Sequence, residues 1–218
     1  MLRALFFRLK ERLPGLAKLI FRLRGQRLSR LWVPSGVSVE GDISAVRNIR
    51  FSISGRDNRV LIGPWTIVDD LHLVIQGSNN VICLGEDVRV LNSVFHIEDD
   101  GSRIEVGDGS ILKLMALGMT EPNSTVRMGK DCMIAPGVDI RNGDSHAIYD
   151  GDTRERINRA QDMIIGDRVW VGVRAMLLKG TQIADGCIVG AASVVAKPLT
   201  EARALYVGTP PRLVRSNI

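Results

Sequence analysis

Short apolar steps separated by glycine and polar residues recur through most of the chain. The hexapeptides IGPWTI, LGEDVR, VGDGSI and MGKDCM start 22 residues apart, at Ile62, Leu84, Val106 and Met128. An earlier copy, VEGDIS, starts at Val39, and two later copies, IGDRVW and IADGCI, start at Ile165 and Ile183. A fixed period of this length is typical of a repeat protein in which each repeat forms one structural unit.

The later copies also contain a shorter period of six residues. One apolar residue stands at every sixth position, at Ile165, Val171, Leu177, Ile183, Val189 and Val195. The fifth position of the hexapeptides holds small side chains, at Thr66, Val88, Ser110, Cys132, Val169 and Cys187. Small side chains are expected where residues point into a narrow, closely packed interior.

Each 22-residue repeat equals three hexapeptides plus four residues. The extra residues are the turn formers GRDN, GSNN, DDGS and EPNS, whose glycine, asparagine and aspartate favour tight turns. We therefore predict an all-β fold over residues 34–199, a three-sided parallel β-helix in which each coil adds one strand to each of three sheets. Neighbouring coils should lie about 4.8 Å apart.

The repeat is interrupted once, at residues 143–161. The coil that begins at Met128 should end near residue 150, but the next coil begins at Ile165, which leaves 15 extra residues at one corner. Long loops on rigid scaffolds are frequently functional. His146 stands near the start of this loop and is the candidate for its chemistry.

The first 33 residues form a different segment. Apolar residues recur there at helical spacing around Pro14-Gly15, with Arg and Lys between them, which predicts two short basic amphipathic helices. Two interpretations stay open: the helices lie on the inner face of an anionic membrane, or they pack on this protein or a neighbouring subunit. Frequent cations and the lack of a small-residue cleavage site argue against a signal peptide or a membrane span. Residues 200–218 are predicted as a C-terminal tail.

Charge and cysteine content narrow the functional class. The chain has a formal net charge of +5, of which residues 1–30 supply +8, so the remainder carries −3 and does not resemble a nucleic-acid-binding domain. The three cysteines form no CxxC pair, which favours a reducing, cytoplasmic compartment over a disulfide framework or a zinc site. His72, His96 and His146 share no column of the repeat, so a three-histidine metal enzyme is disfavoured and no metal is predicted.

These hexapeptides, the loop string Asp144-x-His146-x-Ile148-x-Asp150 and the resumption IGDRVWVG at 165–172 resemble the hexapeptide-repeat acyltransferases. Within that superfamily they look like the bacterial polysaccharide and capsule O-acetyltransferases. The resemblance implies a left-handed β-helix and a homotrimer. It also implies that acetyl-coenzyme A runs along the groove between subunits, with neither a metal nor an acyl-enzyme. The implied acceptor is a glycan or its sugar precursor.

The resemblance also implies roles for individual residues. His146 matches the general base, and Trp170 matches a tryptophan whose indole N–H lies near the thioester sulfur. The predicted coenzyme contacts are Trp170, Gly172, Ala191, Ala192, Lys197 and Arg212, of which Lys197 and Arg212 are phosphate contacts. Apart from the resemblance, a main-chain N–H near Val171-Gly172 is the predicted oxyanion donor.

Elementary chemistry fits these assignments. A histidine with a pKa near ~6.5 is largely neutral at physiological pH and accepts the proton of an attacking sugar hydroxyl. Asp144 either orients the imidazole ring or caps the turn. Charged and polar residues of the loop are the predicted acceptor contacts, namely Asp150, Arg154, Arg156 and Asn158. A solvated loop with local ion pairs explains the same charges without a ligand.

Two other functions remain open. The same donor groove and base would serve N-acetylation of an amino sugar. A β-helix without catalytic activity would explain the repeat and the basic segment as a scaffold. Trp170 occupies an outward-facing position of its hexapeptide, where it forms either a ligand wall or a subunit contact.

Overall fold

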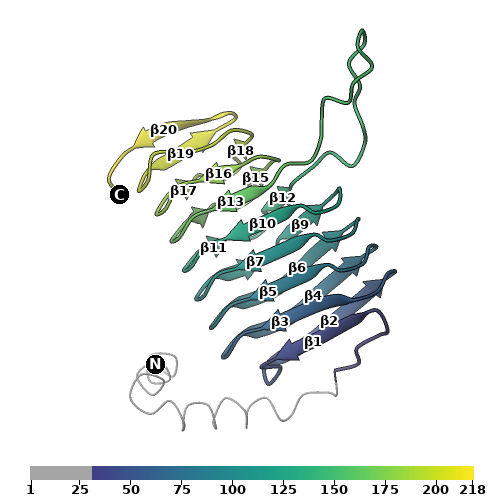
Figure 1. The fold of residues 1–218 in the computed structure, drawn as a ribbon. Coiled ribbons are helices and arrows are strands. Elements are labelled where there is room, and N and C mark those ends of the chain that lie inside the picture. The colour runs from purple at the N-terminus through teal and green to yellow at the C-terminus, as the bar shows by residue number, and fades with distance from the viewer. Residues whose placement is uncertain (1–30) are drawn as a thin grey trace, which may run out of the picture.

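The computed structural model describes residues 31–218, which form a parallel β-solenoid built from strands alone (Figure 1). Residues 1–30, which contain most of the predicted helical segment, lie outside the described residues. No helix in residues 31–218 has the length and apolarity needed to cross a bilayer. The predicted all-β parallel fold is confirmed.

One face of the prism, called side one, is a sheet of seven strands, and each coil contributes one of them. Its strands are β1 (Val37–Gly41), β3 (Asn58–Ile62), β5 (Val81–Leu84), β7 (Arg103–Val106), β10 (Thr125–Met128), β13 (Met163–Ile165) and β16 (Gln182–Ile183).

The other two faces belong to one sheet of thirteen strands, because the early strands run across both. These long strands are β2 (Val46–Ile53), β4 (Ile67–Ile75) and β6 (Arg89–Ile97). Beyond them, side two contains β8 (Ile111–Lys113), β11 (Met133–Ile134), β14 (Trp170–Val171), β17 (Ile188–Val189), β19 (Leu205–Gly208) and β20 (Pro211–Arg215). Side three contains β9 (Ala116–Met119), β12 (Asp139–Arg141), β15 (Met176–Leu177) and β18 (Val194–Val195).

The strand register reproduces the sequence period. Val60 pairs with Ile82, 22 residues on, and Val126 pairs with Met163, 37 residues on, which is one repeat plus the 15-residue insertion. The start predicted for the first repeat is wrong, because Val39 pairs with Val60 and it is Gly41 that pairs with Ile62. Gly41 has φ +104°, and a Cβ there would lie 2.0 Å from the Ile62 carbonyl oxygen, so this coil turns at a residue that only glycine fits.

The predicted inward columns are confirmed. The six apolar residues from Ile165 to Val195 are at most 3% exposed, and the six small residues from Thr66 to Cys187 are at most 1% exposed. Larger side chains such as Leu71, Phe95 and Leu112 fill the rest of a core that runs the length of the prism. Burial of this apolar surface is the main stabilising contribution to the fold.

A ladder of polar side chains stacks at the corner between sides three and one. The main-chain N–H of Asn80 donates to Asn58 Oδ1 at 3.0 Å, and that of Ser102 donates to Asn80 Oδ1 at 2.7 Å. Ser102 and Ser124 share a hydroxyl contact of 3.2 Å, and Asn142 Nδ2 donates to Ser124 Oγ at 2.8 Å. The ladder ends at Asn142, where the inserted loop begins.

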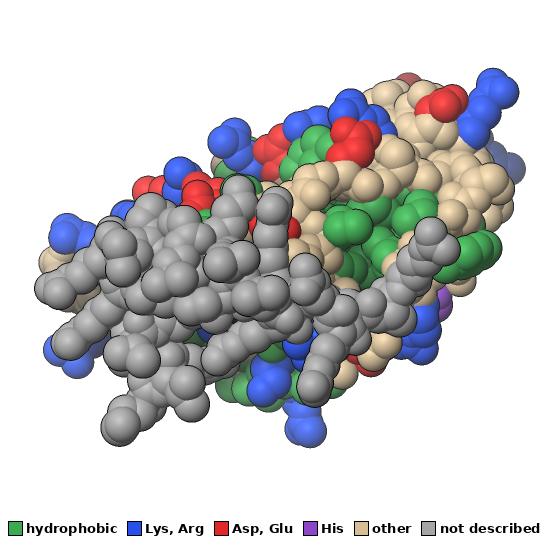
Figure 2. All heavy atoms as spheres, turned by 90° about the horizontal axis from the view of Figure 1, so that it is seen from below, with side chains coloured by type: hydrophobic (Ala, Val, Ile, Leu, Met, Phe, Trp, Pro, Cys, Tyr) green, Lys and Arg blue, Asp and Glu red, His purple; other side chains and the backbone are tan. Residues whose placement is uncertain are grey.

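The two ends of the solenoid differ. At the C-terminal end, residues 200–218 contain β19, which pairs in parallel with β17, and β20, which folds back antiparallel onto β19. These strands lie beyond the predicted end of the β-helix. At the N-terminal end, Figure 2 shows hydrophobic side chains among charged ones, and first-coil residues such as Val39 and Phe51 are only partly buried.

Candidate active site

The inserted loop leaves the prism after β12 as a narrow arm (Figure 1). Its base is closed by the Gln161 N–H, which donates to the Asn142 carbonyl at 2.8 Å. Further out, the Ile157 N–H donates to the Ile148 carbonyl at 2.9 Å, which makes the arm a hairpin. The loop therefore projects from the regular corner at a defined place.

Asp150 shapes the tip of this hairpin. Its Oδ1 accepts hydrogen bonds from the main-chain N–H groups of Asp152 at 2.9 Å and Thr153 at 2.8 Å, and from the Thr153 hydroxyl at 3.1 Å. The Thr153 N–H, followed by that of Asp152, holds the pKa of Asp150 below its usual value. Asp150 thus caps a turn, and the neighbouring Arg154 is exposed.

His146 combines a fixed main chain with an exposed side chain. Its N–H donates to the Asp144 carbonyl at 2.7 Å, and its own carbonyl accepts from Asn158 Nδ2 at 2.7 Å. Ser145 before it has φ +59°, in the left-handed region that a non-glycine residue rarely adopts. The tight turn presents the imidazole outside the solenoid surface.

Asp144 contacts neighbours other than the imidazole. Its carboxylate forms an ion pair with Lys179 and accepts from Asn158 Nδ2 at 2.9 Å. Lys179, followed by Asn158, holds the pKa of Asp144 below its usual value. These contacts tie the start of the loop to the next coil.

Asn158 and Arg156 also make contacts inside the protein. Asn158 is 5% exposed, and its Oδ1 accepts from the Ile148 N–H at 2.6 Å, so both ends of its amide are used within the loop. Arg156 forms an ion pair with Glu121, whose carboxylate also accepts from the Ala160 N–H at 3.0 Å. The structure thus gives these two residues a role in holding the loop, which the sequence did not predict.

Trp170 lies on side two with its indole 48% exposed, as expected for an outward position. It stands in register between Met133, which is 49% exposed, and Ile188. At the adjoining corner, Gly172 packs against the next coil, where a Cβ would lie 2.7 Å from the Ala191 nitrogen. The predicted oxyanion donor is engaged, because the Gly172 N–H donates to the Val189 carbonyl at 2.8 Å.

The remaining predicted coenzyme contacts are exposed near the C-terminal end. Ala191 and Ala192 follow β17, and Ala192 adopts φ +56° at the corner between sides two and three. Lys197 follows β18 at the next corner, whereas Arg212 lies on β20, opposite Val207 of β19. Gly172, Ala191 and Ala192 therefore meet at one corner, and Lys197 stands apart from them.

His146 and Trp170 belong to opposite edges of side one. The loop leaves the corner before β13, and Trp170 follows the corner after β13. Residues 161–167 span the face between them, a distance of about 20 Å at about 3.3 Å per residue. One chain alone therefore does not bring the predicted base and the predicted donor wall together.

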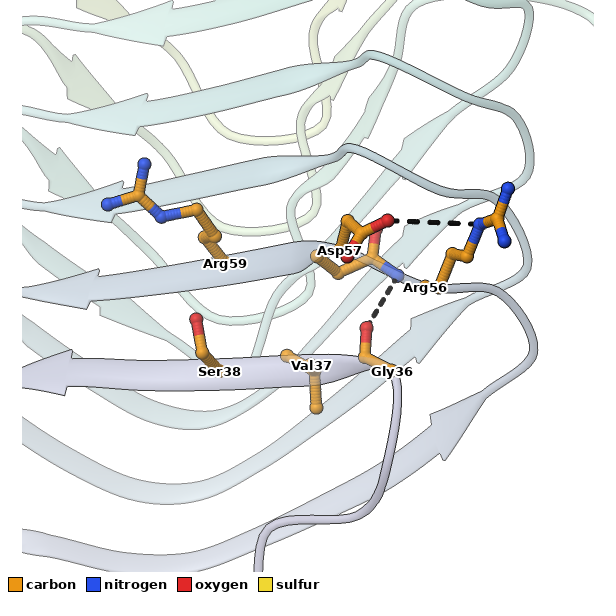
Figure 3. A pocket seen from close by; sticks show the side chains of 7 residues that line it. Gly36, Val37, Ser38, Arg56, Asp57 and Arg59 are labelled. Carbon is orange, nitrogen blue, oxygen red and sulfur yellow. Dashed lines mark hydrogen bonds and ion pairs between the residues drawn. The ribbon is translucent and has the colours of Figure 1, made fainter.

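A pocket of about 430 Å³ lies far from both groups, on the first coils (Figure 3). Its lining includes Ser38, Asp57 and Arg59, and Arg59 forms an ion pair of 3.3 Å with Glu40. It contains none of the predicted site residues. Within residues 31–218 no group of three or more metal-binding side chains occurs. His72 lies in register with Val94, and His96 lies in register with Val74, two residues further along the strand.

Comparison with known proteins identifies the repeat. Residues 162–197 match the family described as bacterial transferase hexapeptide (six repeats). The chain is 32% identical over 136 residues to a polysialic acid O-acetyltransferase of Neisseria meningitidis, which covers 60% of each protein. The crystal structure of the polysialic acid O-acetyltransferase OatWY superposes with a TM-score of 0.73 at 27% identity, over 84% of this chain and 89% of that chain.

Residues 162–197 thus carry the hexapeptide repeat of bacterial transferases, and the chain is similar to polysialic acid O-acetyltransferases. It is also 36% identical over 93 residues to a polysialic acid O-acetyltransferase of Escherichia coli O1:K1 / APEC, covering 43% of this chain. This hexapeptide-repeat chain matches 60% and 30% of the lengths of the two curated relatives. It therefore spans less than two thirds of either of them.

Sequence reasoning missed three residues around the loop of this hexapeptide-repeat protein. Lys179 and Glu121 hold its two ends, and Glu98 accepts a hydrogen bond of 3.4 Å from the Ser145 hydroxyl. Each comes from a different coil, so no local motif joins it to the loop. The repeat period was the available signal, because Glu98 and Glu121 occupy the same corner as the loop in earlier coils.

Proposed function

We propose that the protein is an acetyl-coenzyme A-dependent O-acetyltransferase that modifies a hydroxyl of a bacterial surface polysaccharide or its sugar precursor. The observation that carries the proposal is the combination of two parts. The chain is similar to polysialic acid O-acetyltransferases, and its one long loop presents an exposed histidine within an Asp-x-His string.

In the proposed reaction His146 is the general base and transfer is direct. The imidazole accepts the proton of the attacking hydroxyl while that oxygen forms a bond to the thioester carbonyl carbon. The carbon–sulfur bond then breaks, and the thiolate of coenzyme A takes up a proton. The fixed main chain of His146 supports this role, because positioning of donor and acceptor can contribute roughly 7–11 kcal/mol toward the barrier. General-base catalysis adds typically 10²–10⁴-fold.

The proposed donor wall is the exposed part of side two. The indole of Trp170 and the thioether of Met133 offer an apolar surface, and Arg212 on β20 supplies an exposed cation for a phosphate group. Lys197, the second proposed phosphate contact, is exposed at the corner beyond side three. The close approach of Gly172 to Ala191 keeps the neighbouring corner free of side-chain bulk. Bound coenzyme would supply the activated acetyl group, and these residues would hold its thioester end and its phosphates.

On the acceptor side, Arg154 has a guanidinium exposed for a carboxylated glycan, and Arg159 nearer the base of the loop is exposed as well. Asp150 contributes by shaping the hairpin tip that carries it. Arg156 and Asn158 contribute indirectly, because both are used to hold the loop.

A homotrimer is part of the proposal. The loop and Trp170 lie on opposite edges of side one, so a site that contains both needs two chains. The arm also carries Ile148, Tyr149 and Ile157, each more than half exposed, which are suited to contact with a neighbouring subunit. The proposed location is the cytoplasm, where residues 1–30 contact either the inner membrane face or the trimer.

The function is tested with purified protein, acetyl-coenzyme A and polysialic acid, the polymer named for the relatives. Release of free thiol that depends on the acceptor, with an acetyl group that hydroxylamine removes from the glycan, supports O-acetylation. A hydroxylamine-stable product formed when an amino sugar with a free amine replaces polysialic acid as acceptor favours N-acetylation instead. If neither product forms and titration shows no coenzyme A binding, the protein is a scaffold and the proposal is wrong.

A further inference from the structure

Ion pairs from both neighbouring coils hold the root of the inserted loop. Lys179, which follows β15 in the coil after the loop, pairs with Asp144, with side chains 24% and 40% exposed. Glu121, in the coil before the loop, pairs with Arg156, and both side chains are 21% exposed. Partly buried pairs are screened less by water and salt than fully exposed pairs.

The Lys179 ammonium contacts both strands of the loop. Besides Asp144 near the start of the loop, it lies 3.4 Å from the Asn158 carbonyl oxygen near the end of the loop. The loop strands are separated in sequence by the whole hairpin, so one side chain of the rigid solenoid fixes the spacing between them.

Asn158 connects this contact to His146. Its Nδ2 donates to Asp144 Oδ2 at 2.9 Å and to the His146 carbonyl at 2.7 Å. Its Oδ1 accepts from the Ile148 N–H at 2.6 Å. The His146 carbonyl and the Ile148 N–H that follows it are therefore bonded to a buried amide, which shares the Asp144 carboxylate with Lys179.

We propose that Lys179 is a positioning residue for His146 and acts through Asp144 and Asn158. The inference rests on the proposed function for its catalytic consequence, because it assumes that His146 is the base. A displacement of about 1 Å in a catalytic group can cost about 10²-fold in rate. Release of the loop strands from Lys179 allows movement of that size in an exposed arm.

The restraint of the two loop strands by Lys179, called the lock below, is tested without any reaction. The measurement is hydrogen exchange of the unliganded full-length protein followed by mass spectrometry. Lys179→Met removes the charge and keeps the length of the side chain, and Lys179→Arg restores the charge. The matched control is Lys130→Met, which breaks a 2.9 Å ion pair with Asp108 at the corner between sides one and two, away from the inserted loop.

We expect peptides covering residues 144–158 to exchange about tenfold faster in Lys179→Met, as for local opening of a weakened segment. The Lys179→Arg and Lys130→Met proteins should exchange in this region like the wild type. Wild-type exchange of the loop in Lys179→Met would overturn the lock.

The catalytic consequence is read from the acetyl-transfer assay. Lys179→Met should lower kcat about 10- to 100-fold with the KM for acetyl-coenzyme A nearly unchanged, and Lys179→Arg should recover most of kcat. Because the residues act in one network, adding Asp144→Asn to Lys179→Met should cost no further activity. An unchanged kcat or additive losses would contradict positioning. If the wild type transfers no acetyl group, the proposed function fails, while the exchange result still decides whether the lock exists.

Discussion

Individual residues at the loop root owe their roles to neighbours that are distant in sequence. Asn158 looks like an ordinary polar loop residue, yet it is 5% exposed and bonded to the main chain around His146. Asp144 is two residues from His146, yet its carboxylate contacts Lys179, 35 residues away. The arrangement leaves the imidazole as the exposed functional group of the turn.

Trp170→Ala tests the donor wall at this scale. Removal of the 48% exposed indole should raise the KM for acetyl-coenzyme A about tenfold, since an aromatic contact of this kind contributes on the order of 1 kcal/mol or more. Steady-state kinetics with varied acetyl-coenzyme A measure the effect. The control is Ile164→Ala on side one of the same coil, which is 49% exposed and should leave that KM unchanged. Equal effects of the two substitutions would argue against a donor site at Trp170.

Gly172→Ala tests how closely the coils pack beside that wall. The added methyl would lie 2.7 Å from the Ala191 nitrogen, so the backbone must shift, at a cost of about 1–3 kcal/mol. The expected result is a Tm lower by several °C in a thermal scan. Gly151→Ala is the control, because nothing lies within 4 Å of a Cβ at the hairpin tip, and its Tm should match the wild type. A wild-type Tm for Gly172→Ala would contradict the packing described.

Much of the residue-level core could be predicted from the sequence. The six-residue period fixes which side chains point inward, and Cys132 and Cys187 are buried there as the pattern requires. The contacts of Asn158 and Lys179 could not be predicted, because they depend on the path of an irregular loop over a neighbouring coil. The hydrogen bond of the Gly172 N–H could not be predicted for a related reason, since its partner, the Val189 carbonyl, lies in the next coil.

Among the structural elements, the inserted loop is an addition to an otherwise regular corner. Its base pairs the Gln161 N–H with the Asn142 carbonyl at 2.8 Å. The length of the insertion could be read from the sequence, because the repeats on both sides hold their register. The hairpin within it could not, because Ile148 and Ile157 pair outside the repeat.

Replacement of residues 143–161 by the four-residue turn GSNN tests whether the loop is separable from the fold. The solenoid strands and the ladder that ends at Asn142 remain, so the far-ultraviolet circular dichroism should keep its β-type spectrum. Acetyl transfer should fall to background, because His146 is removed. Residual transfer at more than a few per cent of the wild-type rate would show that the loop is dispensable.

The ends of the solenoid were predicted less well than its middle. The first coil starts two residues later than the pattern suggested, because the turn is made at Gly41. The strands β19 and β20 follow no hexapeptide column, and β20 runs antiparallel. Terminal repeats are commonly atypical because they have a neighbour on one side only.

For the whole molecule, the separation of His146 and Trp170 by the width of side one leads to a prediction about assembly. At acetyl-coenzyme A concentrations below the wild-type KM, co-expressed His146→Ala and Trp170→Ala chains should be more active than the average of the two homotrimers, because mixed trimers contain sites with both residues intact. The control is a mixture of the two separately purified homotrimers under conditions in which they do not exchange subunits. Activity per amount of protein is compared between this mixture and the co-expressed protein. Absence of any recovery in verified mixed trimers would place both residues of a site in one chain.

The central claim is that His146 serves as the base for acetyl transfer to a glycan hydroxyl. The most direct measurement is kcat for wild-type and His146→Ala protein with acetyl-coenzyme A and polysialic acid, with oligomer mass and Tm measured alongside. The account predicts acetyl-ester formation by the wild type and a loss of about 10²–10⁴-fold in the variant, with mass and Tm unchanged. Near-normal turnover by a correctly assembled His146→Ala protein would contradict it.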